Sequence, residues 1–153
     1  MTGPTVGILL EDKLSDTAKE EVLAFIHSVS DEVRGRDFWV NDSPFGYEFG
    51  PDYPEELDEY AELNLLTEWK PKDIIGLYSM CNSKRDHRVL GEVTLSIVKI
   101  VRGKVAFNSL LNNYTSDPVI LNDPSTIEFK NESIINPENF ERWLQHKDFR
   151  MVK

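Results

Sequence analysis

The chain of 153 residues contains a single cysteine, Cys81, so it cannot form an internal disulfide. Cysteine usage of this kind is typical of proteins from reducing compartments. The first residues lack a basic region followed by an apolar run, and no apolar stretch is long enough to span a bilayer. We therefore expect a cytoplasmic protein that does not enter a membrane. The length predicts one domain, residues 1–153.

The sequence also lacks the common motifs of metal and phosphate sites. The three histidines lie far apart, and none belongs to a His-x-x-x-His or Cys-x-x-Cys pair. The eight glycines are scattered and form no glycine-rich phosphate loop. These patterns predict no metal and no cofactor.

Positive charge is scarce. The formal net charge is −10 and the pI is about 4.7. The tightest basic group, Lys84, Arg85 and Arg88, is interrupted by Asp86. Binding to nucleic acid or to an anionic membrane needs a local basic patch, and the sequence predicts neither partner.

One long window, residues 37–69, has no lysine, arginine or histidine at all. Its main part, residues 45–69, is called the acidic segment here, and in it aromatic residues alternate with acids. A solubilising surface is the simplest explanation. However, segregated like charges repel one another, and exposed aromatic rings are typical of interfaces.

We therefore predict that the acidic segment is a docking face for a protein with a basic cleft, in which the acids speed capture and the rings prolong binding. Tyr53 and Tyr60 are the expected anchors, and Asp37 and Asp42 are expected at the rim. The predicted contact residues are Glu48, Asp52, Tyr53, Glu55, Glu56, Asp58, Glu59, Tyr60 and Glu62.

Hydrophobic periodicity predicts two successive β-α-β units. Strands are expected at residues 6–10, 38–40, 74–80, 105–107 and 126–129, with residues 41–44 closing the second strand. Helices are expected after the cap residues 15–17, where Thr17 with Glu20 matches a capping box, and after Ser83 and Asn136. The pattern favours an α+β fold with helices packed on a mainly antiparallel sheet, in a ferredoxin-like, split βαβ arrangement.

The local structure of the acidic segment has two alternatives. Residues 55–66 fit a helix that starts at Pro54, with Leu57, Tyr60, Ala61 and Leu65 on one side. They fit equally an ordered loop that leads into a strand at residues 63–69.

An enzymatic alternative rests on Cys81 and His87. A thiol near a helix N-terminus can be activated, and a nearby histidine would act as its base. The same residues are also typical of a turn, a helix cap and a core position, and no supporting acid follows at a fixed spacing. We therefore expect no enzyme; a small thiol-dependent enzyme and a non-catalytic adaptor or regulatory module remain alternatives.

Two stretches of the second half resemble a known group of proteins. "CNSKRDHRVLG" (residues 81–91), Gly103 and the terminal "RWLQHKDFRMVK" (residues 142–153) are similar to small bacterial immunity proteins of polymorphic toxin systems, including Rhs-type effectors. The similarity begins at about Ile74 and does not include the acidic segment. Arg102 stands where a glycine pair with Gly103 is expected.

The resemblance implies a protein that binds a cognate toxin domain and blocks its active site. It carries over no catalytic residue. Toxins that act on nucleic acid or on NAD, such as nucleases or ADP-ribosyltransferases, have basic clefts that an acidic, aromatic surface would complement.

Overall fold

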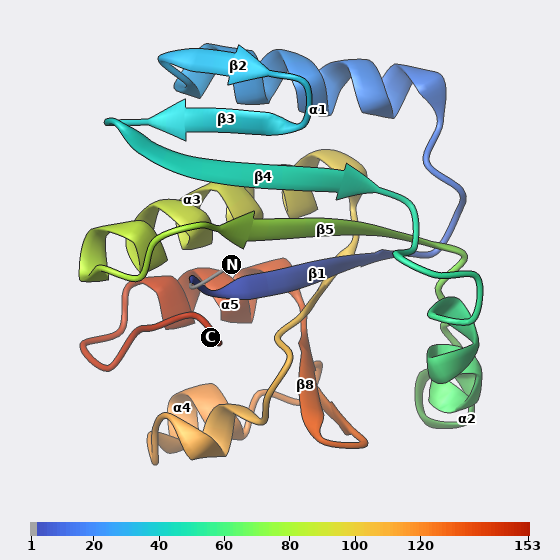
Figure 1. Ribbon diagram of the computed structural model, residues 1–153. Coiled ribbons are helices and arrows are strands. Elements are labelled where there is room, and N and C mark those ends of the chain that lie inside the picture. Colours follow the sequence, from blue (N-terminus) through green and yellow to red (C-terminus); the bar gives the residue numbers. More distant parts are fainter. Residues whose placement is uncertain (1–2) are drawn as a thin grey trace.

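The computed structural model describes residues 3–153, and its centre is one eight-stranded antiparallel sheet (Figure 1). The strand order is β2-β3-β4-β5-β1-β6-β8-β7. The strands are β1 (Thr5–Leu10), β2 (Glu32–Arg34), β3 (Asp37–Val40), β4 (Ser43–Phe49), β5 (Asp73–Ser79), β6 (Lys104–Ala106), β7 (Ile127–Phe129) and β8 (Glu132–Ile135). The helices are α1 (Asp16–Val29), the 3₁₀ helix η1 (Leu57–Leu63), α2 (Asn64–Thr67), α3 (Lys84–Val101), the 3₁₀ helix η2 (Leu111–Asn113), α4 (Pro118–Leu121) and α5 (Pro137–Leu144).

The middle of the sheet has the predicted split βαβ arrangement, but β4 takes the place that the sequence analysis gave to residues 38–40, which form β3 of an added hairpin. Along the chain β1, α1, β4, β5, α3 and β6 form two β-α-β units, and their strands lie in the order β4-β5-β1-β6. This is the split βαβ order, with every neighbouring pair antiparallel. The hairpins β2–β3 and β7–β8 extend the two edges. The prediction of an α+β fold is therefore confirmed.

The helices predicted after residues 15–17, Ser83 and Asn136 are all present. The cap of α1 is Ser15, whose side chain accepts a hydrogen bond from the N–H of Ala18. Thr17, predicted to cap this helix with Glu20, already lies within it. Ser83 and Asp86 form a reciprocal capping box at α3. Asn136 caps α5, where Pro137 occupies the first turn.

The two faces of the sheet are covered differently. Successive side chains of a strand point to opposite faces. Val6, Ile8 and Leu10 of β1 therefore pack in the larger core with residues of α1, α3 and α5, whereas Leu9 belongs to a smaller cluster on the opposite face. That cluster includes Tyr60 and Leu63 of η1. Figure 1 shows α1, α3 and α5 behind the sheet and α2, in the helical part of the acidic segment, at one end of it.

One predicted turn is wrong. Residues 43 and 44 begin the central strand β4, and the turn between β3 and β4 contains only Asn41 and Asp42. Both have positive φ values, 51° and 67°, as a tight two-residue hairpin turn requires. Pro44 obscured the strand because proline donates no ladder hydrogen bond. Its carbonyl nevertheless accepts one from Met80.

In the acidic segment the helical alternative holds, and the strand at residues 63–69 is wrong. Most of the helix is 3₁₀, in which residues three apart lie on one face. Tyr60 and Leu63 are therefore buried and Leu57 is partly buried. Ala61 and Leu65, which an α-helical spacing places inward, are exposed, and Leu65 is 80% accessible.

Within residues 3–153, the longest helices lack the length and hydropathy that crossing a bilayer would need.

The tight passage from α3 to β6 provides a stability test. A Cβ added at Gly103 would lie 2.5 Å from the backbone oxygen of Leu9, which the sheet holds in place. We expect Gly103→Ala to lower the free energy of unfolding by about 1–3 kcal/mol, the usual cost of overpacking. Chemical denaturation measures the change.

Gly76→Ala is the matched control, because its added Cβ would meet no heavy atom closer than 4.0 Å. Equal destabilisation by the two substitutions would contradict the steric explanation.

Candidate functional site

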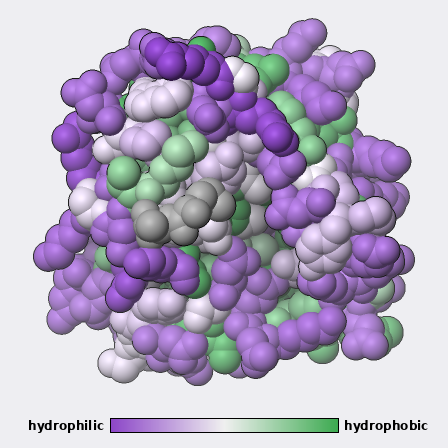
Figure 2. Space-filling model, viewed as in Figure 1, coloured by the Kyte–Doolittle hydropathy of each residue, from purple (hydrophilic) through white to green (hydrophobic). Residues whose placement is uncertain are grey.

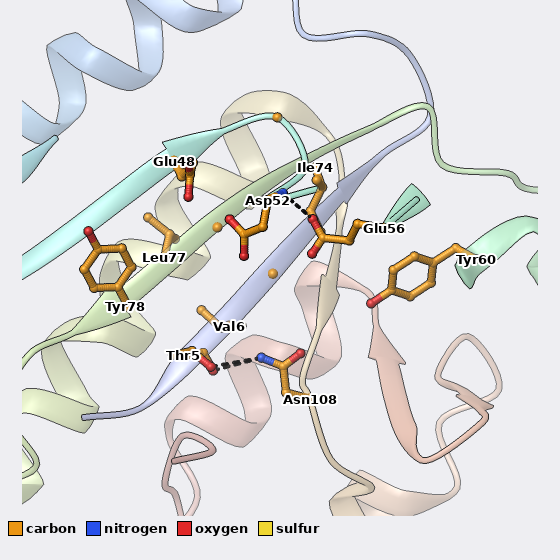
Figure 3. Close-up of a pocket in the computed structure, with 13 residues that line it drawn as sticks. Thr5, Val6, Glu48, Asp52, Glu56, Tyr60, Ile74, Leu77, Tyr78 and Asn108 are labelled. Carbon is orange, nitrogen blue, oxygen red and sulfur yellow. Dashed lines mark hydrogen bonds between the residues drawn. The ribbon is translucent and has the colours of Figure 1, made fainter. Parts of the chain in front are cut away.

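A hollow of about 220 Å³ opens on the sheet face opposite α1, α3 and α5 (Figure 3). Two glycines leave space in its floor. Gly7 of β1 lies opposite Gly76 of β5, and Gly76 also lies opposite Glu48 of β4. Because neither glycine has a side chain, the middle of the sheet is recessed between the flanking residues. We call this hollow the acidic groove.

Three carboxylates overhang the acidic groove. Glu48 comes from β4, Asp52 from the following loop and Glu56 from the turn before η1. Figure 3 shows the three side chains converging over β5 and β1. The backbone N–H of Asp52 donates to Oε1 of Glu56 at 2.8 Å, which holds the loop against the start of η1.

The remaining walls come from distant parts of the chain. Tyr78 lies across Gly46 on one side, where a Cβ at Gly46 would lie 2.1 Å from the ring. Thr5 and Asn108 close another side, joined by hydrogen bonds from the Asn108 amide at 3.3 Å. The surrounding surface is mostly hydrophilic, with hydrophobic residues in small separate patches (Figure 2).

The carboxylates perturb one another. A hydrogen bond with Glu48, together with partial burial and the charge of Glu56, raises the pKa of Asp52 to about 6. The same hydrogen bond lowers the pKa of Glu48, and Arg36 lowers it further. Asp52 is therefore the carboxyl of this pair that is protonated first as the pH falls, because two adjacent carboxylates resist ionising together.

Glu48 is the groove carboxylate with a basic partner. Arg36 Nη1 lies 2.7 Å from its Oε1. The arginine side chain is 65% exposed, and a pair so open to solvent contributes at most about 1 kcal/mol. Neutralisation of the groove is therefore partial.

The two expected aromatic anchors have different environments. Tyr53 is 43% exposed, and its hydroxyl donates to Glu59, which raises the pKa of Tyr53 to about 12. Tyr60 is only 9% exposed, and its ring centroid lies 6.0 Å from that of Phe129. This corrects the expectation for Tyr60, whose ring attaches η1 to the sheet. Tyr53 retains the exposure that an anchor for a partner requires.

The other predicted contact residues form a rim. Glu55, Asp58, Glu59 and Glu62 are exposed around η1 and do not line the acidic groove. Residues 37–69 hold ten of the 27 acids and none of the 17 lysines and arginines. The rest of the chain therefore has equal numbers of acidic and basic residues, and the whole formal net charge of −10 comes from residues 37–69.

Sequence reasoning missed several residues of this region. Gly7, Gly76, Thr5, Tyr78 and Asn108 meet only through the pairing of β1 with its neighbours. A further carboxyl, Glu132, lies in a neighbouring hollow with Glu56, Glu59 and Tyr60. Burial raises the pKa of Glu132. None of these residues belongs to a local motif.

The geometry does not support the Cys81–His87 alternative. His87 Nδ1 accepts the N–H of Met151 at 2.9 Å, so Nε2 carries the hydrogen and donates it to Asn82 Oδ1 at 2.7 Å. Burial and the nearby Arg150 lower the pKa of His87. Both ring nitrogens are thus engaged away from the exposed Cys81.

Among residues 3–153, no three His, Cys, Asp or Glu side chains are arranged to hold a metal ion.

The raised pKa of Asp52 predicts a titration of this carboxyl near pH 6, observable by carboxyl-carbon NMR. In Glu48→Gln the neighbouring charge is absent, and we expect the Asp52 midpoint to fall. Folding raises the pKa of Asp52 from 3.8 to about 6. The contribution of this carboxyl to the free energy of unfolding is therefore complete below pH 4 and is lost as the pH rises through 6.

Asp52→Asn should accordingly flatten the decline in stability between pH 4 and pH 7. An Asp52 midpoint near 4 in the parent protein would contradict the interaction of the two carboxyls.

Comparison with known proteins assigns the chain to a family. No curated protein and no solved structure matches it. One family model, described as a family of unknown function (DUF6368), matches residues 2–153. The match covers nearly the whole chain, and the protein therefore belongs to the DUF6368 family.

Proposed function

We propose that this protein is a cytoplasmic immunity protein that binds a cognate toxin domain and blocks its active site without catalysis. The acidic groove is the observation that carries the proposal. It combines three convergent carboxylates with a recessed floor, and the exposed Tyr53 follows the groove residue Asp52 in the chain. A basic protein surface has the complementary charge.

The size of the groove favours a side chain as its occupant. Small-molecule sites usually enclose roughly 300–1,000 Å³, and about 220 Å³ lies below that range. A single lysine or arginine side chain offers a long apolar stem and a cationic head. The stem would lie over Gly7 and Gly76, and the head would reach Asp52 and Glu56.

The exposed acids around the groove have a separate role in the proposal. Charges at the rim of an interface mainly accelerate association, whereas desolvated central pairs determine how long the complex lasts. Glu55, Asp58, Glu59 and Glu62 would steer the partner, and Tyr53 would pack against it. Nucleases and ADP-ribosyltransferases are the proposed toxin classes because their substrates require basic clefts.

Residues 81–91 and 142–153 resemble immunity proteins, and for this reason we propose that the partner is a toxin and that the protein is not a general adaptor. Those residues lie outside the acidic groove. The resemblance and the groove are therefore separate lines of support for the same proposal.

Groove occupancy predicts a pH dependence of binding. A cation placed beside Asp52 would lower its raised pKa, so the complex favours the deprotonated carboxyl. An immunity gene is expected to lie directly beside the gene of its toxin, so the product of the neighbouring gene is the partner to test. We expect the affinity for that product to strengthen as pH rises from 5 to 7. In Asp52→Asn this dependence should weaken; an unchanged profile would argue against contact at Asp52.

A pair of charge-matched double variants separates groove from rim. Asp52→Asn/Glu56→Gln removes two groove carboxylates, whereas Asp58→Asn/Glu62→Gln removes two rim carboxylates. We expect the groove variant to weaken binding at least tenfold, about 1.4 kcal/mol, chiefly through faster dissociation. The rim variant should mainly slow association at low salt, as surface plasmon resonance would measure.

Equal dissociation rates for both double variants would contradict the groove as the central contact. Failure of the parent protein to co-purify with the neighbouring gene product, or to protect cells from it, would contradict the function itself.

A further inference from the structure

A second cavity, of about 510 Å³, lies between the first turns of α3 and the residues that follow α5. In Figure 1 these segments meet at the end of the sheet opposite to α2. Four basic side chains line the cavity, namely Lys84, Arg88, Lys147 and Arg150. In the sequence they form two distant pairs, Lys84 with Arg88 and Lys147 with Arg150. The fold therefore creates the basic patch that the sequence does not predict.

The two arginines are held in place. Arg88 Nη1 donates to the carbonyl of Leu144 at 2.6 Å, and its guanidinium lies 5.0 Å from the centroid of the Phe149 ring. Arg150 lies 5.4 Å from the centroid of the Tyr114 ring. Positioned guanidinium groups suit the planar, two-point recognition of phosphate.

Further donors surround the cavity. The side chains of Lys84 and Lys147 are exposed and extend the positive charge. His87 directs its hydrogen to Asn82 Oδ1, so the amide nitrogen of Asn82 points away from His87 as an additional donor. The hydrogen bond between Met151 and His87 fixes this orientation.

Negative charge in the lining is limited to Asp148, among the residues that the structure describes. Its N–H donates to His146 Nδ1 at 3.0 Å, and Thr115 donates to its carboxylate at 3.4 Å. His146 Nε2 donates to Asp117. The four cations therefore exceed the local carboxylate charge, in a chain whose net charge is −10.

We propose that this basic cavity binds the phosphate group of a small molecule. Its volume lies within the usual range of small-molecule sites, roughly 300–1,000 Å³. Its concave shape favours a compact ligand over an extended nucleic acid. This site is separate from the acidic groove and does not depend on the proposed toxin partner.

Inorganic pyrophosphate is the probe, titrated by calorimetry and by amide NMR at low salt. We expect saturable binding with shift changes concentrated in residues 82–88 and 146–150. Lys84→Ala/Lys147→Ala should weaken the affinity at least tenfold, because it removes two exposed cations without removing packing contacts.

Lys70→Ala/Lys72→Ala is the control, since it removes the same charge from two exposed lysines outside the cavity. The affinity of this control variant for pyrophosphate should match that of the parent protein. The inference is overturned by undetectable binding, by equal losses in the two variants, or by malonate binding as tightly as pyrophosphate, which would indicate an unselective response to anions.

Discussion

The antiparallel pairing of β1 with β5 is the constraint on which the rest of the structure depends. It joins the two β-α-β units, places α1 and α3 on one face, and aligns Gly7 with Gly76 on the other. A shift of one residue would move the glycines to the helix-covered face and turn large apolar side chains outward. The same register thus secures the core and opens the groove.

The helical part of the acidic segment and the basic cavity lie on either side of β5 in the chain. The helices η1 and α2 of the acidic segment precede this seven-residue strand in the chain, and the basic cavity begins with Asn82, shortly after the strand ends. In the acidic groove, the interaction of Glu48 with Asp52 raises the pKa of Asp52 and lowers that of Glu48. The repulsion that remains between these carboxylates at neutral pH lowers the stability of the folded protein, and a cationic partner would reduce it.

Much of the fold was predictable because local signals agreed. The caps at Ser83 and Asn136 and the helical stripes specify α3 and α5. Pro44 concealed β4, and α-helical spacing misassigned the buried face of a 3₁₀ helix. The acids of the site were visible as composition, but Tyr60 became internal through contact with Phe129. The groove floor and the pairing of residues 84–88 with 147–150 depend on long-range packing, which no local pattern encodes.

The central claim is that Asp52 and Glu56 receive a basic side chain above the glycine floor. A structure of the complex with the neighbouring gene product tests it most directly. Our account predicts a lysine or arginine nitrogen of the partner within salt-bridge distance, about 4 Å, of one of these carboxylates. A complex in which the groove faces solvent, while another surface holds the partner, would contradict it.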